Sequence, residues 1–133
     1  MYPTYKDGDF LLMKNNEEFK RDNIVVFNSP TSWGAEGKRF IKRIVAIEGD
    51  SIQVNGNNVF VNGKKRELER YTCENNEINK SFTLKKNEYF VLGDNILQSN
   101  DSLNQICSGS ESFLIKESMI INSGKEVFKL GGF

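Results

Sequence analysis

Short apolar runs with a two-residue period fill much of this chain, and glycine or Asn-Gly dipeptides separate them. The runs most typical of strands cover residues 10–13, 24–27, 40–47, 51–54, 58–61 and 89–92. Side chains of a strand alternate between its two faces, so each such run can pack one face against a core. Asn55-Gly56 lies between two of these runs and predicts a hairpin, and Asn62-Gly63 is a second turn dipeptide. The sequence therefore predicts an all-β fold.

The other segments carry weaker signals. The 133 residues are enough for one domain, 1–133, and too few for two. Residues 64–81 are charged and Asn-rich, which indicates a small exposed insert that opens with a solvated turn at Lys64-Lys65-Arg66. One more strand is expected at residues 118–121, and residues 15–22 could hold a single helical turn.

Composition excludes several function classes. The 18 basic and 18 acidic residues give a formal net charge of zero, whereas a nucleic-acid surface needs a basic excess. The chain has no histidine, which excludes a His-based catalytic triad or zinc site and leaves a Ser-Lys dyad among the few hydrolytic arrangements. We expect no nucleic-acid partner, no metal and no cofactor. No apolar run approaches the roughly 20 residues of a membrane span, and there is no signal-peptide core.

One lysine stands inside an apolar run. Lys42 would share its strand face with Phe40 and Ile44. Desolvation there would lower its pKa, and a neutral amine near pH 7 is what a lysine general base requires. From this segment alone, a lysine that snorkels from an edge strand is the more frequent alternative.

Several short sequence boxes follow one another across residues 1 to about 102. They are Met1-Tyr2-Pro3-Thr4 with Gly8-Asp9, then Ile24-Val25-Val26-Phe27, then Lys42-Arg43 through Gly49-Asp50, and finally Gly93-Asp94-Asn95 with Ser99-Asn100-Asp101-Ser102. These boxes and their order resemble those of the type I signal peptidases, peptidase family S26, and the joint order is far more specific than any single Gly-Asp turn. The resemblance implies coiled antiparallel β-sheets.

The resemblance also implies site roles. The family's nucleophile is a serine immediately before the Met-x-Pro-Thr box, so that residue is not in this sequence, and we expect the 133-residue chain itself not to cleave substrates. Lys42 would be the general base and Ser99 would hydrogen-bond and orient it. Arg43, Asp94 and Asp101 would give structural support, with Asp101 paired to Arg43. The walls of a substrate cleft for small side chains fall at Met1, Tyr5, Leu11, Val26 and Ile41.

The chain departs from the family pattern at five positions. Ala46 and Glu48 replace a glycine and a Pro or Gly, Ile96 and Leu97 replace a charged pair, and Leu103 replaces an arginine. The last three changes remove ion pairs that brace the family's site, but they leave the lysine in place.

Two function classes follow from the resemblance. The first is a membrane-associated serine endopeptidase that removes signal peptides from exported preproteins, pilins among them. An N-terminal anchor outside this sequence would hold it in the cell membrane with its catalytic domain on the extracytoplasmic side. The alternative is a non-catalytic, signal-peptidase-like protein that assists pilus or surface-protein assembly. A self-cleaving repressor is a weaker third choice, because the chain has no DNA-binding segment.

Cys73 and Cys107 could form one disulfide in that compartment. Their spacing does not decide the matter, and we slightly favour two free thiols.

Overall fold

The computed structural model describes residues 10–13, 19–34, 38–56, 58–67, 78–94, 100–124 and 126–130. Strands dominate these ranges, which confirms the predicted all-β class. The strands are β1 (Phe10–Met13), β2 (Ile24–Asn28), β3 (Arg39–Ala46), β4 (Ser51–Asn55), β5 (Asn58–Val61), β6 (Lys64–Arg66), β7 (Asn79–Thr83), β8 (Glu88–Leu92), β9 (Ile115–Lys116), β10 (Ile120–Gly124) and β11 (Glu126–Leu130). Three short helical segments accompany them: η1 (Thr31–Trp33), α1 (Ser102–Cys107) and η2 (Glu117–Met119).

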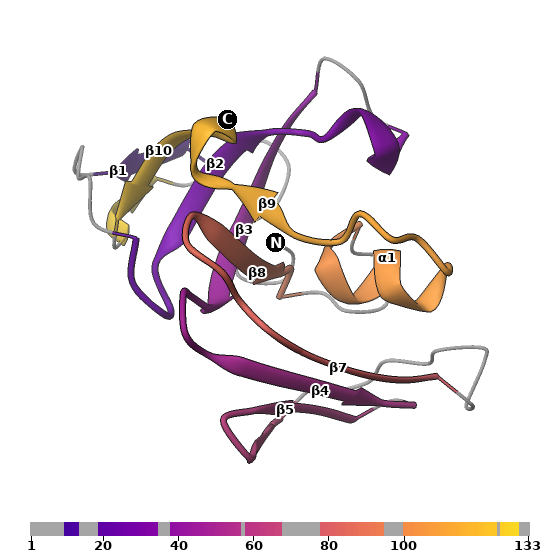
Figure 1. Cartoon of the computed structure of the whole chain (residues 1–133). Helices are drawn as coiled ribbons and strands as arrows, with labels where there is room; N and C mark the ends of the chain where they lie inside the picture. Colours follow the sequence, from indigo (N-terminus) through magenta and orange to yellow (C-terminus); the bar gives the residue numbers. More distant parts are fainter. Residues whose placement is uncertain are drawn as a thin grey trace.

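All strand pairs are antiparallel and form three sheets. The largest has the order β10-β2-β3-β8-β9, the second β6-β5-β4-β7, and the third pairs β1 with β11. In Figure 1 the four-stranded sheet lies below the five-stranded one, and α1 lies to one side of both. The long strand β3 lies at the centre of the largest sheet, so the residues it carries have strands on both sides.

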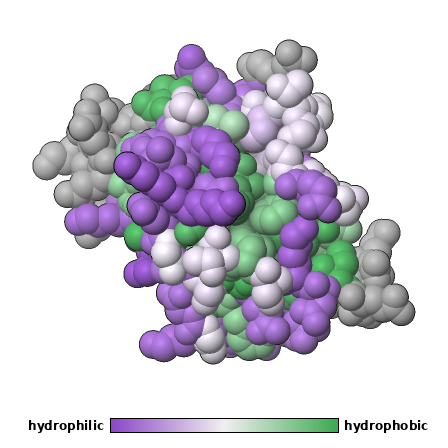
Figure 2. Space-filling model, viewed as in Figure 1, coloured by the Kyte–Doolittle hydropathy of each residue, from purple (hydrophilic) through white to green (hydrophobic). Residues whose placement is uncertain are grey.

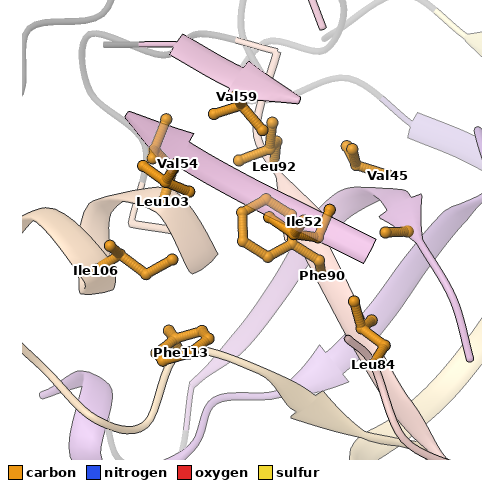
Figure 3. Close-up of a cluster of buried hydrophobic side chains, with 11 residues drawn as sticks. Val45, Ile52, Val54, Val59, Leu84, Phe90, Leu92, Leu103, Ile106 and Phe113 are labelled. Carbon is orange, nitrogen blue, oxygen red and sulfur yellow. The ribbon is translucent and has the colours of Figure 1, made fainter. Parts of the chain in front are cut away.

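Two apolar clusters hold the sheets together. The first fills the space between the four-stranded sheet, β8 and α1. Figure 3 shows Leu103 and Ile106 of α1 pointing toward Ile52, Val54 and Phe90. The second covers one face of the five-stranded sheet and contains Val25, Phe27, Trp33, Ile44, Tyr89, Val91 and Ile115. Burial of such side chains supplies most of the favourable free energy of folding. On the face in Figure 2, hydrophobic residues show between hydrophilic areas.

The predicted hairpins form, but one prediction about them is wrong. β4 and β5 pair from Ile52↔Val61 to Asn55↔Asn58, around the turn that begins at Gly56. Asn62 and Gly63 both have positive φ, 52° and 81°, as a two-residue type I′ turn requires. That turn folds Lys64–Arg66 back along β5 as strand β6, so this basic run is not a solvated turn. The predicted insert, 64–81, therefore begins and ends in strands, and residues 68–77 lie outside the described ranges.

Helix α1 is a second difference from the sequence-based expectation, which placed no helix there. Asp101 is its N-cap residue and accepts a hydrogen bond from the backbone N–H of Asn104 at 2.9 Å. Leu103 and Ile106, three residues apart, bury the inner face of the helix. At its end, Cys107 is disulfide-bonded, which corrects the slight preference for free thiols. The only other cysteine of the chain, Cys73, lies outside the described residues.

The strand expected at 118–121 is confirmed in its second half, where β10 begins at Ile120, whereas residues 118 and 119 belong to η2. Of the turn expected within 15–22, residues 15–18 lie outside the described ranges. Within the ranges that the structure covers, no helix combines the length and the apolar character needed to cross a bilayer.

Candidate active site

Lys42 is buried in the middle of β3. Only 8% of its surface is exposed, and its Nζ lies 5.5 Å from the centre of the Phe40 ring on the same strand face. Burial lowers the pKa of Lys42 from its ordinary value of 10.5, because desolvation penalises the ammonium form. The lysine is therefore not a snorkelling surface residue, and its amine is shifted toward the neutral form.

The neighbouring strands explain this burial. Val25 of β2 lies opposite Lys42 in the antiparallel register. Its side chain is fully buried, as is that of Ile44 two residues further along β3. On the other side of β3, Arg43 lies opposite Leu92 of β8. Because this pair is antiparallel, the chain that follows Leu92 runs toward the position of Lys42.

That following segment supplies carboxylates to the site. Asp101 and Asp94 both attract the Lys42 ammonium and oppose the lowering of its pKa, but desolvation has the larger effect. Asp101 is 1% exposed, and its Oδ2 accepts a hydrogen bond from the Gly93 N–H at 3.0 Å. This bond, together with the helix cap that Asp101 also forms, closes the base of the loop from Gly93 to Asp101.

Arg43 ties the loop to β3. Its Nε and Nη2 each donate to Asp94, to Oδ1 and Oδ2 respectively, at 3.3 Å. Its Nη1 donates to the backbone oxygen of Asp22 at 3.0 Å. The partner predicted for Arg43 was Asp101, and that pair stays a prediction, whereas the Arg43–Asp94 pair is part of the structure.

Ser99 lies outside the described residues, but the residue after it is firmly placed. Asn100 donates from Nδ2 to the backbone oxygen of Trp33 at 3.1 Å. Its Oδ1 accepts a hydrogen bond from Gln105 of α1 at 2.7 Å. Trp33 in turn donates from its indole N–H to the backbone oxygen of Ser112 at 2.8 Å. The chain therefore emerges from the Ser99 segment at a fixed position.

Only two of the five predicted cleft residues have described side chains. Val26 and Ile41 lie opposite each other on β2 and β3, and both are half-buried. By strand alternation they are on the face opposite to Lys42. Leu11 lies in β1, but its side chain, like the whole of Met1 and Tyr5, is outside the described part of the structure.

Asp50 is the centre of a buried polar cluster that the sequence did not predict. Arg21 binds its carboxylate through Nε, at 2.8 Å, and through Nη2. The Asn62 Nδ2 and the Ile47 N–H donate to it at 2.9 Å. These bonds lower the pKa of Asp50 to about 2, the Arg21 bond most strongly, against the opposing effect of burial. Gly49-Asp50 was visible as a turn, but nothing in the sequence pointed to Arg21, 29 positions away, as the partner.

The site therefore has a desolvated amine, that of Lys42, in the middle of β3. Asp94, Asp101 and Arg43 hold the ends of the adjoining loop. Such an amine can accept a proton from a hydroxyl. Within the described ranges, no three His, Cys, Asp or Glu side chains gather closely enough to hold a metal ion.

Comparison with known proteins shows which family this chain is similar to. The family model described as signal peptidase, peptidase S26, matches residues 1–128. Signal peptidase I T of Bacillus subtilis is 33% identical over 143 aligned positions, which cover 96% of this chain and 68% of that protein. Signal peptidase I U of the same organism is 34% identical over 128 positions, covering 86% and 66%.

A solved structure shares the fold. The crystal structure of a signal peptidase I from Enterococcus faecalis V583 matches with a TM-score of 0.54 and 20% identity, over 79% of this chain and 95% of that one. The match to the family model extends from Met1 across the lysine strand, the Gly-Asp-Asn segment and α1 to Phe128. This chain belongs to the signal peptidase family, peptidase S26.

Proposed function

We propose that this chain is the catalytic domain of a membrane-associated serine endopeptidase of the Ser-Lys dyad type, which removes signal peptides from exported preproteins. The observation that carries the proposal is the burial of Lys42 at the centre of β3, with its pKa lowered by desolvation. A buried lysine costs stability, and a general base is a use that justifies this cost.

In the proposed mechanism, a serine immediately before Met1 in the full-length protein attacks the scissile carbonyl. Neutral Lys42 accepts the serine proton and later returns a proton to the leaving amine. Ser99 donates or accepts a hydrogen bond that orients the lysine. Backbone amides and hydroxyls beside the nucleophile stabilise the oxyanion.

Arg43, Asp94 and Asp101 support this machinery without touching the substrate. The Arg43–Asp94 contact and the Asp101–Gly93 hydrogen bond fix the two ends of the loop that carries Ser99. A loop held at both ends loses little entropy when it aligns with a neighbouring strand. These residues therefore act on the reaction through the position of Ser99 relative to Lys42.

The substrate would bind as an extended strand along a cleft formed by Met1, Tyr5, Leu11, Val26 and Ile41. Main-chain pairing supplies affinity, and the walls restrict alternate side chains to small residues. Val26 and Ile41 are neighbours on β2 and β3 and are half-buried, which supports an apolar wall formed by these two residues. We place the domain on the extracytoplasmic side of the cell membrane, where preproteins, pilins included, emerge.

Cleavage of a signal-peptide-bearing preprotein by the full-length protein tests the proposal. We expect Lys42→Ala to lower the rate by about 10²- to 10⁴-fold, the usual contribution of a general base. Lys38→Ala is the matched control, because Lys38 is an exposed lysine just before the same strand, and it should cleave at the normal rate.

Two results would overturn the proposal. If the Lys42→Ala protein keeps its activity within a few-fold of normal, Lys42 is not the general base and its role is structural. Tight binding of the preprotein without turnover, in a full-length protein that has the preceding serine, would favour the alternative of a non-catalytic protein for pilus or surface-protein assembly.

A further inference from the structure

A positively charged pocket lies between the 21–22 turn and the β5–β6 hairpin, and none of the cleft residues lines it. Its volume is about 370 Å³. Four of its eight lining residues are basic, namely Arg21, Lys64, Lys65 and Arg66, and Asp22 is the one acidic residue. The whole chain has a formal net charge of zero, so this excess of positive charge is a local property of the pocket.

Arg21 is fixed in direction by a buried carboxylate. Its bonds to Asp50 use Nε and Nη2. The Asp50 side chain is 3% exposed, whereas that of Arg21 is 51% exposed. The guanidinium is therefore held from below while half of its surface stays accessible. A cation held in this way can bind an anion without the entropic cost of ordering a long side chain.

Arg66 also lines the pocket and has a weaker partner. Its Nη1 lies 3.3 Å from Asp22 Oδ1, and the Asp22 side chain is 70% exposed. Ion pairs this exposed contribute little to stability. The backbone of Asp22 is held more strongly, since its N–H donates to the Ile44 oxygen at 2.8 Å and its own oxygen accepts from Arg43.

The two lysines provide positive charge that the pocket does not compensate. Lys64 and Lys65 are consecutive residues of β6, an edge strand of its sheet, so Lys64 shares a strand face with Arg66 and Lys65 lies on the other face. In the described part of the chain, neither lysine has an ion-pair partner. The two arginines are balanced by Asp50 and Asp22, so about two positive charges remain.

The floor of the pocket strengthens the attraction of these charges for an anion. Val45 is 3% exposed and Val61 is half-buried against the first apolar cluster. An apolar floor lowers the local dielectric constant, and charges beside it interact more strongly than in open water. A phosphate group carries a charge of about −1.5 to −2 at pH 7 when it is a monoester, which matches the excess.

We propose that this pocket binds a phosphate group, held by the fixed Arg21 guanidinium together with Arg66 and Lys64, while Lys65 adds positive charge beside the pocket. The ligand class is a phosphate or pyrophosphate anion, either free or as the headgroup of an anionic phospholipid. This assignment is independent of the proposed peptidase activity, because none of the four basic residues belongs to the lysine site or to the cleft.

Titrations of the protein at about 0.15 M NaCl test the proposal, with backbone amide shifts as the readout. Inorganic phosphate and pyrophosphate probe the free anion, and vesicles of phosphatidylglycerol, compared with phosphatidylcholine alone, probe the lipid headgroup in a sedimentation assay. We expect saturable binding in one of these arms, with amide shifts at residues 21–22 and 61–66. The double variant Lys64→Gln/Lys65→Gln should weaken it at least about tenfold, since hydrogen bonds to charged groups are each worth about that factor.

A matched control is built into the chain. Lys85 and Lys86 are also consecutive and exposed, and they do not line this pocket, so Lys85→Gln/Lys86→Gln should bind normally. Asp22→Asn removes the only acidic lining residue and should strengthen binding; asparagine also tolerates the positive φ of 69° at that position. Absence of saturable binding in every arm would overturn the proposal. So would equal weakening by the two double variants.

Discussion

Lys42 and Asp50 are both buried ionisable residues of the β3–β4 region. The surroundings of Asp50 stabilise its charged form, whereas those of Lys42 destabilise its charged form. Lys42 and Asp50 are 8% and 2% exposed, and both have a lowered pKa. For Asp50 the lowering favours the charged form, because Arg21, Asn62 and the Ile47 N–H all donate to the carboxylate. For Lys42 it favours the neutral form, because desolvation outweighs the attraction of Asp101 and Asp94.

This difference separates a structural charge from a reactive one. Hydrogen bonds from its partners stabilise the charge of Asp50, and these bonds connect three turns, at residues 21, 47–50 and 62. The charged form of Lys42 is destabilised by desolvation, and a pKa perturbed in this way is typical of functional groups. Burial alone would not have distinguished the two residues.

Removing each charge in turn should give the largest difference in stability between the two sites. We expect Asp50→Asn to lower the free energy of unfolding by about 2 kcal/mol at pH 7, because a pKa of about 2 against the ordinary 3.8 corresponds to that energy. Lys42→Met should leave stability unchanged or raise it, since the burial penalty leaves with the amine. Urea unfolding measures both values.

Glu111→Gln is the control for these variants, because the Glu111 side chain is 91% exposed. Its effect should stay within about 0.5 kcal/mol. The comparison fails if Asp50→Asn is no less stable than this control, or if Lys42→Met costs as much as Asp50→Asn.

The pH dependence of stability should sharpen the comparison. Asp50 has a lower pKa in the folded than in the unfolded chain, so its contribution is present above about pH 4 and is lost as the pH falls toward 2. Lys42 also has a lower pKa when folded, so the unfolded chain binds more protons between that lowered pKa and 10.5, and stability rises with pH across this window. Unfolding series from pH 2.5 to 10 should show a smaller acid loss in Asp50→Asn, where that of Glu88 remains, and a smaller alkaline gain in Lys42→Met. If either variant has the same pH profile as the unmodified protein, the pH effect assigned to that residue is refuted.

The smallest expected effect concerns the charges around Lys42. Asp94 raises the pKa of the lysine, so Asp94→Asn should lower that pKa further and move the rising limb of the pH–rate profile to lower pH. Loss of the Asp94 carboxylate also leaves the positive charge of Arg43 less compensated, which acts in the same direction. A limb that moves to higher pH, or one that Glu111→Gln moves equally, would contradict this account.

The sequence predicted the strands whose burial pattern has a period of two, and it predicted Lys42 because Phe40 and Ile44 flank it. It did not predict β6, because Lys64–Arg66 has no apolar residue and becomes a strand only through the Asn62-Gly63 turn. It did not predict α1 either. A helix of six residues spans too few turns for a periodic signal, although Asp101 followed by Leu103 and Ile106 was a usable cap and face.

The site was predictable where one segment carries the chemistry and unpredictable where distant segments meet. Val26 and Ile41 were expected only as cleft walls implied by the family resemblance, and the structure shows them as neighbours on β2 and β3. Asp50 with Arg21, and Arg43 with Asp94, each join residues far apart in the chain, 29 and 51 positions. Such pairs depend on the packing of whole sheets, which composition and spacing do not encode locally.

The aromatic ring contacts beside β3 give this protein an internal optical reporter. Trp33 is its single tryptophan and lies 6.3 Å, between ring centres, from Phe40, the ring that the Lys42 amine faces. Indole emission responds to nearby charge and to hydrogen bonding at the ring nitrogen, and here that nitrogen is bonded to Ser112. Fluorescence of the unlabelled protein should therefore follow the titration of the lysine in real time, in the same cuvette as a cleavage assay.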